Sequence, residues 1–160
     1  MTTPGRLLVA GALAWCSLAR AGSLTPVTVT GSSASLEGAS PDALADGDIR
    51  TADLKAKLAG SEWLIRLPAP TVISLVAVHH SAQSRGQAAP QTIRITFDDG
   101  TSLPLGCSAA DGWSRTRVPQ VRTSRVRLRV ESTADDATGP GGLDEVRVET
   151  PAALDTGGPA

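Results

Sequence analysis

The sequence is poor in aromatic side chains and lacks two residue types that ligand sites often use. Its 160 residues include one phenylalanine, three tryptophans and no tyrosine. Asparagine is absent as well. Binding sites for polar ligands commonly combine aromatic surfaces with a few amide, carboxylate or arginine groups that orient the ligand. A site in this chain must therefore rely on arginine, acids, histidine, hydroxyl groups and very few rings.

Cysteine is also scarce, and one of the two cysteines falls in what looks like an export signal. Residues 1–21 have the three parts of a secretory signal: Arg6 as the positive flank, an apolar stretch from Leu7 to Leu18, and the cleavage sequence Ala19-Arg20-Ala21. The apolar stretch is too short to span a bilayer. We therefore expect an exported protein, secreted or periplasmic, with no transmembrane segment in the mature chain. Trp15 precedes Cys16 where a lipoprotein signal would have a small residue, so lipid anchoring is the weaker alternative.

Cleavage after Ala21 would leave Cys107 as the only cysteine, which excludes a disulfide within the mature chain. Gly106 and Ser108 flank it, and no base stands beside it in the sequence. We therefore expect a small packed side chain. The reactive alternative would need a base that the fold brings to the thiol.

Charge is nearly balanced overall but uneven along the chain. The formal net charge is −1, and loss of the signal would remove arginines and no acid. This balance gives no argument for nucleic acid or an acidic membrane surface as a partner. Arginines that cluster late in the chain, between strand hydrophobics, are typical of a solvated sheet face paired with acids such as Glu145 and Glu149. A sulfated or phosphorylated partner is the alternative. The clustered arginines are Arg115, Arg117, Arg122, Arg125, Arg127 and Arg129.

The hydrophobic residues recur with the period of β-strands. Val126, Leu128 and Val130 alternate with arginines, as in a sheet with one buried face and one solvent-exposed face. Proline, glycine and paired aspartates separate this run from others of the same kind. No segment of helical period competes with them, so the predicted class is all-β with about eight strands. The expected strands are Val27–Thr30, Glu62–Leu67, Val72–His79, Thr92–Phe97, Thr101–Leu105, Arg115–Val118, Arg125–Val130 and Glu145–Glu149.

These strands fit one domain over residues 22–150. Ser40 and Pro41 are residue types that cap and begin a helix, and they predict a short helical turn that reaches Leu44. The tail over residues 151–160 is rich in small residues, proline and glycine and is predicted to be disordered. A composition rich in alanine, arginine and glycine with few lysines is typical of a bacterial protein.

Several ordered motifs resemble the discoidin, or coagulation factor 5/8 type C, domain. They are Asp46-Gly47-Asp48 followed by Thr51, the runs 62–67, 71–78 and 124–130, and the closing segment 142–148. Residues 90–100 and 121–128 are also similar to glycan-binding modules attached to some NAD-degrading enzymes. The resemblance covers residues 27–149 and implies a galactose-binding-like jelly roll, a β-sandwich of two antiparallel sheets with ligand loops at one end. Ala52-Asp53-Leu54 stands where the family usually has a large residue after the Asp-Gly-Asp loop.

The same resemblance implies a structural calcium ion (Ca2+) in the Asp46 loop. Asp46, Asp48 and Thr51 offer hard oxygens at close spacing around a glycine, which suits calcium. The family often adds a glutamate of the closing strand, here Glu145. The alternative is an Asx-turn, in which these side chains accept local backbone hydrogen bonds without an ion. In both cases the residues would fix the loop and would do no chemistry.

Four residues are candidates for ligand contacts: Trp113, His79, His80 and Arg85. Trp113 follows a turn and is the expected stacking surface, although it could equally fold back over a sheet end. Trp63 lies in an apolar run and is expected in the core, with its indole N–H bonded to the backbone. Adjacent strand residues point to opposite faces, so His79 and His80 cannot easily chelate one metal. Either histidine could bind a sugar hydroxyl beside Arg85 or cap backbone carbonyls at the strand end.

Motifs for catalysis are missing. The sequence has no Gly-x-Ser-x-Gly elbow, His-Glu-x-x-His helix, phosphate-binding glycine loop or Cys-x-x-Cys pair. Asp98-Asp99 and Asp135-Asp136 are better explained as turn residues than as a glycosidase pair, whose carboxyls face each other across a cleft. We therefore predict a non-catalytic, lectin-like module that binds a glycan or cell-surface polysaccharide through its end loops. The alternatives are a cell-envelope protein-interaction or structural domain that has lost the sugar site, and an unrecognised hydrolase with a deep pocket holding a histidine and an acid.

Overall fold

A computed structural model describes residues 23–24, 28–31 and 34–151. The expected secretory signal and nearly all of the expected tail lie outside these residues, as does Val27 at the start of the first expected strand. In the part of the chain that the structure describes, no helix combines the length and apolar character needed to cross a membrane.

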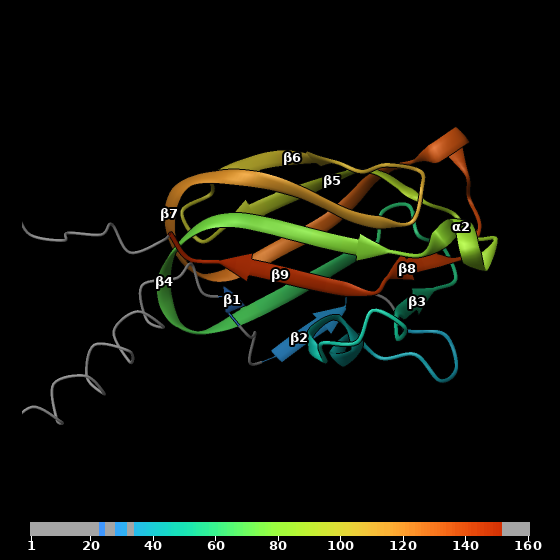
Figure 1. Ribbon diagram of the computed structural model, residues 1–160, viewed down its shortest axis with the longest axis horizontal. Helices are drawn as coiled ribbons and strands as arrows, with labels where there is room; N and C mark the ends of the chain where they lie inside the picture. The colour runs from blue at the N-terminus through green and yellow to red at the C-terminus, as the bar shows by residue number, and fades with distance from the viewer. Residues whose placement is uncertain (1–22, 25–27, 32–33, 152–160) are drawn as a thin grey trace, which may run out of the picture.

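Strands dominate the described residues, which confirms the all-β prediction (Figure 1). The helical turn predicted after Ser40 is present as a 3-10 helix, and the Ser40 hydroxyl accepts a hydrogen bond from the Asp42 amide at 3.3 Å. Two further short helical turns are not predicted by the sequence. The helical turns are η1 (Pro41–Ala45), α2 (Ala82–Arg85) and η2 (Ala134–Asp136). The strands are β1 (Ser23–Leu24), β2 (Thr28–Gly31), β3 (Asp53–Lys55), β4 (Glu62–His80), β5 (Pro90–Phe97), β6 (Ser102–Gly106), β7 (Gly112–Thr133), β8 (Gly141–Leu143) and β9 (Glu145–Glu149).

Two long strands, β4 and β7, give the sheet its sandwich form. They pair antiparallel along most of their length. Each crosses the molecule, turns back and returns, so its two halves lie in different layers (Figure 1). The β4 turn contains Pro68 and Pro70, where the sequence predicts a break, but the strand continues through a register shift between Arg66 and Thr71. Proline has no N–H for the ladder, which favours an irregularity at this point.

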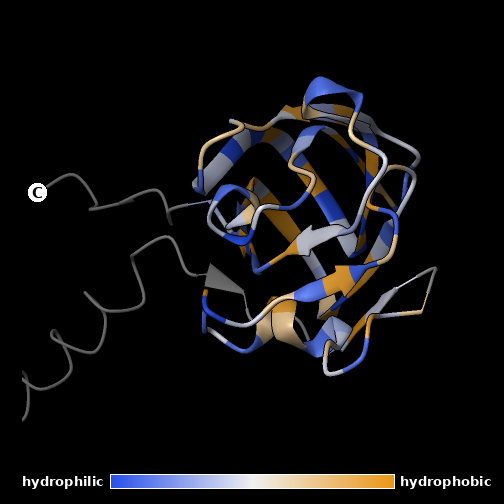
Figure 2. Ribbon diagram, turned by 90° about the vertical axis from the view of Figure 1, so that its right-hand side faces the viewer, coloured by the Kyte–Doolittle hydropathy of each residue, from blue (hydrophilic) through white to orange (hydrophobic). Residues whose placement is uncertain are grey.

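The pairing order divides the strands into two antiparallel layers, the jelly-roll sandwich that the resemblance implies. The first layer holds β2, the first half of β4, the second half of β7, β5 and β6. The second layer holds β1, β9, the second half of β4 and the first half of β7. A short ladder of β3 and β8 lies at one end. Figure 2 looks onto this end, which we call the loop end.

One hydrophobic core lies between the two layers. Ile65, Ile95 and Leu128 of the first layer belong to the same buried cluster as Val76 and Val148 of the second. Each has no exposed surface. Burial of one such side chain contributes roughly 1.5–3 kcal/mol. The alternating apolar positions of the strands therefore hold the layers together.

Trp63 is buried in this core, as predicted, but its indole N–H has a different partner from the backbone group expected. It donates to Asp53 Oδ2 at 2.8 Å. The same oxygen lies 3.0 Å from Lys55 Nζ, and both charged side chains are buried. Gly142 allows β8 to approach β3 closely, because a Cβ there would lie 2.0 Å from the Asp53 carbonyl oxygen. This network fastens β3, and with it the loop end, to the core.

The second half of β7 presents its arginines to water, as predicted. From residue 125 to residue 130 exposed arginines alternate with buried apolar residues. Their acidic partners differ from the expected ones on β9: Arg125 pairs with Asp98 at 2.9 Å, and Arg129 lies 3.7 Å from Glu62. The reason is topological, because this half of β7 lies between β4 and β5, whereas β9 pairs with the other half of β4.

Cys107 lies partly buried against the core cluster. Burial raises the pKa of its thiol to about 11, although a hydrogen bond with Ser114 acts in the opposite direction. At neutral pH the thiol is therefore protonated and a poor nucleophile, as the sequence interpretation expects.

Candidate functional site

A buried carboxylate organises the loop end. Asp144 lies between β8 and β9 and has no exposed surface. Its Oδ2 accepts hydrogen bonds from His79 Nδ1 at 2.7 Å and from the Ser81 hydroxyl at 2.5 Å, and its Oδ1 accepts one from the Arg85 guanidinium at 2.5 Å. The Asp144 amide donates to the His79 carbonyl at 2.8 Å. A buried carboxylate requires such compensation, so these bonds hold the end of β4, α2 and the start of β9 together.

His79 and Trp113, two of the predicted contact residues, touch each other. They are register partners on β4 and β7, and their rings meet edge to face with centroids 5.1 Å apart. The Arg147 guanidinium lies 4.5 Å from the Trp113 ring centroid, which is a cation–π distance. Trp113 remains partly exposed, whereas His79 is only 7 % exposed.

His80 points to the other side of β4, as the alternation of strand residues requires. It has no exposed surface. Its Nε2 lies 2.7 Å from the Ser108 carbonyl oxygen, and its Nδ1 accepts the Ala82 amide at 3.3 Å. Both ring nitrogens are thus bonded to backbone, so the ring joins the Ser108 loop to α2 and offers no nitrogen to a ligand.

Asp111 fixes α2 from the same loop. Its carboxylate accepts hydrogen bonds from the Gln83 amide at 2.9 Å and from the amide and hydroxyl of Ser84. These bonds, that of the Ser84 hydroxyl foremost, lower the pKa of Asp111. The turn that carries Arg85 is therefore held by Asp111 on one side and by Asp144 on the other.

The Asp46 loop has the hydrogen bonds of an Asx-turn. The Asp48 amide donates to Asp46 Oδ1 at 2.8 Å, and the Thr51 hydroxyl donates to Asp46 Oδ2 at 2.5 Å. Gly47 adopts a φ of 76°, which glycine reaches at little cost. Its amide donates to Glu145 Oε2 at 3.2 Å. The loop is thereby bonded to the first residue of β9.

Glu145 brings a further acid to this loop. Burial, and next the negative charge of Asp46, raise the pKa of Glu145 to about 7. The oxygens here are hard donors of the kind calcium takes, and a cation would relieve the repulsion. The Asp48 carboxylate faces Arg50 at 2.9 Å, and among the described residues no three acid, histidine or cysteine side chains are grouped to hold a metal ion. Calcium at Asp46, Asp48, Thr51 and Glu145 therefore stays a prediction.

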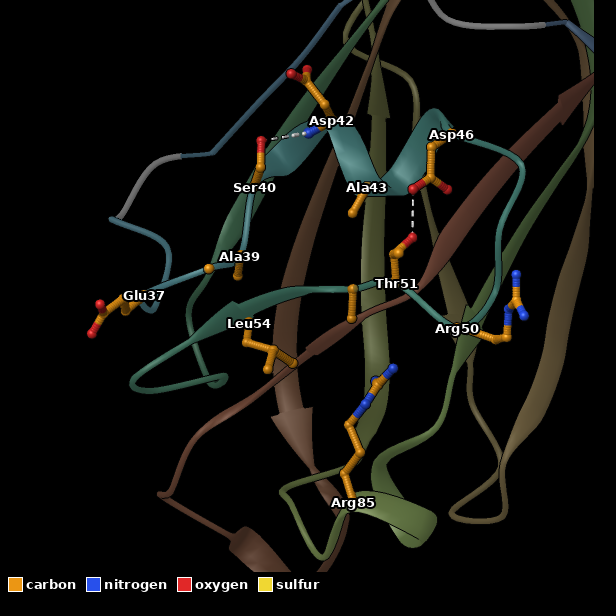
Figure 3. Close-up of a pocket in the computed structure, with 12 residues that line it drawn as sticks. Glu37, Ala39, Ser40, Asp42, Ala43, Asp46, Arg50, Thr51, Leu54 and Arg85 are labelled. Atoms are coloured by element: carbon orange, nitrogen blue, oxygen red, sulfur yellow. Dashed lines mark hydrogen bonds between the residues drawn. The ribbon is translucent and has the colours of Figure 1, made fainter.

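A cleft of about 500 Å³ lies beside the loop (Figure 3). Arg85 extends into it from α2, on the side opposite Asp46 and Thr51. Asp144 holds one guanidinium nitrogen of Arg85, and 23 % of the Arg85 side chain is exposed. The other charged or hydroxyl-bearing side chains of the lining are Glu37, Ser40, Asp42 and Arg50, and Leu54 with three alanines supplies apolar surface.

Comparison with known proteins rests on structure. No protein-family model matches this sequence, and no curated protein matches it. The family 32 carbohydrate-binding module of C. perfringens NanJ, solved in complex with galactose, matches with a TM-score of 0.63 and 13 % identity over 81 % of this chain and 99 % of that one. A pectin-binding module matches with a TM-score of 0.63 and 20 % identity over 82 % and 95 %. The family 32 module of AlyQ, solved with 4,5-unsaturated mannuronic acid, matches with a TM-score of 0.62 and 15 % identity over 79 % and 97 %.

The fold is that of the family 32 carbohydrate-binding modules. This confirms the predicted discoidin-like, galactose-binding-like sandwich. A longer AlyQ chain combines such a module with an alginate lyase domain, and the present chain spans 33 % of its length.

Within this family 32 fold, the predicted site residues fall into two groups that share Asp144. Arg85 lines the cleft together with Asp46 and Thr51, whereas Trp113 contacts His79 and is not among the lining residues. Asp144, which joins His79 to Arg85, is not singled out by the sequence analysis. The available signal is an acid in an otherwise apolar closing segment, because acids are rarely buried unless they are paired.

Proposed function

We propose that this chain is a non-catalytic carbohydrate-binding module that holds a glycan in the loop-end cleft. The observation that carries the proposal is the placement of Arg85. Asp144 fixes this side chain at the wall of an open cleft, at the loop end of a fold that the neighbours described above use in complexes with sugars.

The cleft offers hydrogen-bond donors, acceptors and apolar surface that a sugar can contact. A guanidinium carries five N–H donors in a fixed fork, and Asp144 takes one nitrogen of Arg85, so the rest of the fork can donate to vicinal hydroxyls. Asp42 and Asp46 supply acceptors on the facing wall, and Leu54 offers apolar surface to the sugar ring.

A shallow site of this kind should bind weakly, with a Kd between about 1 mM and 1 μM. Strong attachment to a polysaccharide would then depend on many contacts or on a partner chain. Action outside the cytoplasm, secreted or periplasmic, is part of the proposal and rests on the signal-like residues 1–21.

A glycan array screened with calcium present tests the proposal. Arg85→Lys keeps a cation beside Asp144 but loses the fork of N–H donors. We therefore expect a folded protein whose glycan affinity is reduced by a factor of about ten at most. Trp113→Ala tests the His79–Trp113 pair. Arg117→Ala removes one exposed arginine of the second layer and serves as the matched control. Equal melting temperatures would show that the variants fold.

Each outcome of the array has a distinct meaning. Selective binding that Arg85→Lys weakens and Arg117→Ala leaves unchanged supports the cleft. Loss in Trp113→Ala alone would move the site to the His79–Trp113 pair. If the folded protein bound no glycan on the array, the glycan proposal would be overturned. The cell-envelope protein-interaction alternative, which none of the comparisons supports, would then be favoured. That alternative would then be tested by a pull-down of envelope proteins.

A further inference from the structure

The outer face of the first layer forms a second charged surface, and its hollows share no lining residue with the loop-end cleft. Arg125, Arg127 and Arg129 point outward from β7, because the residues between them are buried. Register pairs place Leu64 of β4 and Thr96 of β5 on either side of Arg127. Opposed residues of paired strands share one face, so Leu64, Arg127 and Thr96 form a row across the sheet. We call this surface the arginine face.

Most arginines of this face already bind a carboxylate of the chain. Arg94 pairs with Glu131 at 2.5 Å. Arg125 pairs with Asp98, and Arg129 lies near Glu62. Arg127, in the middle of the series, is exposed, and its side chain has no ion pair or hydrogen bond with any described residue. The face therefore contains a repeated arginine–carboxylate arrangement in which the central arginine lacks its acid.

Arg127 also borders three neighbouring hollows. The largest has a volume of about 460 Å³ and is lined in part by Arg94, Thr96 and Arg129. Two smaller ones of about 140 Å³ each lie beside Leu64, and Thr30 of β2 lines one of them. Because Arg127 is common to all three, the hollows adjoin one another across β2, β4, β7 and β5. Such a shallow series suits an extended ligand better than a compact one.

We propose that the arginine face binds a linear polysaccharide bearing carboxylates, with Arg127 as its anchor. A carboxylate of the polymer would take the place that Glu131 and Asp98 fill for Arg94 and Arg125, and Thr30 and Thr96 would bind hydroxyls. Nucleic acid fits less well, because the aromatic side chains that border the hollows, Trp63 and Phe97, are buried and cannot stack on bases. This inference does not depend on the loop-end cleft.

Affinity electrophoresis of the full chain in gels containing polygalacturonate tests the proposal, with the fully methyl-esterified polymer as its uncharged counterpart. We expect retardation by the charged polymer only. Arg127→Ala should weaken binding about tenfold or more, and Arg127→Lys should weaken it less, because it keeps the charge and loses the fork. Arg117→Ala removes the same charge from the second layer and should bind like the original chain. Arg85→Lys should also leave this binding unchanged, which separates it from the loop-end cleft.

Three results would overturn the inference. The first is unchanged affinity in Arg127→Ala that melts like the original chain. Equal loss in Arg127→Ala and Arg117→Ala is the second, because it would mean that only total charge matters. The third is equal or stronger retardation by dextran sulfate or by a DNA oligonucleotide of matched charge density, which would indicate a general affinity for polyanions.

Discussion

The loop end and the arginine face both carry many charges, but they compensate them differently. At the loop end, Asp144 is fully buried and both of its oxygens are bonded. On the arginine face, even the paired side chains Arg94 and Glu131 are 42 % and 36 % exposed. A buried charge that loses its partner costs several kcal/mol, whereas an exposed one costs little. The loop end thus uses charge to hold its shape, while the arginine face keeps charge available to a ligand.

Removal of the buried acid should have the largest effect. Asp144→Ala leaves Arg85 and His79 without their acceptor, so we expect the free energy of unfolding to fall by about 3–5 kcal/mol. The matched change on the arginine face, Asp98→Ala, removes a partly exposed partner of Arg125 and should cost on the order of 1 kcal/mol. Urea denaturation measures both losses. Similar values for the two variants would contradict the contrast between the regions.

The titration of Glu145 makes the stability of the loop end depend on pH. Its pKa is raised to about 7 from the ordinary 4.5, so between these values the folded chain holds a proton that the unfolded chain releases. Stability from this group is therefore full below pH 4.5 and is lost as the pH rises through 7. With solvent screening we expect a loss on the order of 1–2 kcal/mol. Urea denaturation at pH 5 and pH 8, in chelator, measures it.

Glu145→Gln is the control for this titration. The variant cannot ionise, so it should lose this part of the pH dependence and be the more stable protein at pH 8. Calcium, if the Asp46 loop binds it, should restore stability to the original chain at pH 8 and should stabilise the variant less. Constant stability of the original chain from pH 5 to pH 8 in chelator would contradict the raised pKa.

The two regions also differ in how far the sequence predicts them. The exposed arginines from residue 125 to residue 130 are predictable because strand alternation is a local property. Their acidic partners are not predictable, because Asp98 and Glu62 are brought beside these arginines only by the order of the strands. The loop end likewise depends on contacts between residues far apart in the sequence: His79 and Asp144 are 65 positions apart. Residue types can suggest such a site, but only the folded β4 and β9 bring its parts together.

Asp98 makes the stability of the arginine face depend on pH in the opposite direction from Glu145. Burial alone would raise its pKa, but hydrogen bonds from Ser124 and Arg125 lower it to about 2 from the ordinary 3.8. Stability from this group is therefore present above pH 3.8 and is lost as the pH falls through 2. Because the side chain is partly exposed, we expect about 1 kcal/mol or less. The difference in unfolding free energy between the original chain and Asp98→Asn should shrink from pH 6 toward pH 2, and a constant difference would rule out the lowered pKa.

The smallest effect on stability should come from Arg127. Arg127→Gln should change the free energy of unfolding by no more than about 0.5 kcal/mol, because the side chain is exposed and has no ion pair with any residue that the structure describes. Its neighbours along β7, Arg125 and Arg129, are cations about 7 Å away along the strand. Loss of the charge should therefore stabilise the protein slightly, and more at low salt than at high salt.

Arg125→Gln is the matched control, since it loses a pair with Asp98 and should destabilise the chain. Urea denaturation of both variants at low and high salt makes the comparison. A clear loss of stability in Arg127→Gln would mean that the chain itself uses this cation. Its charge would then not be free for an external carboxylate, and the arginine face would resemble the loop end.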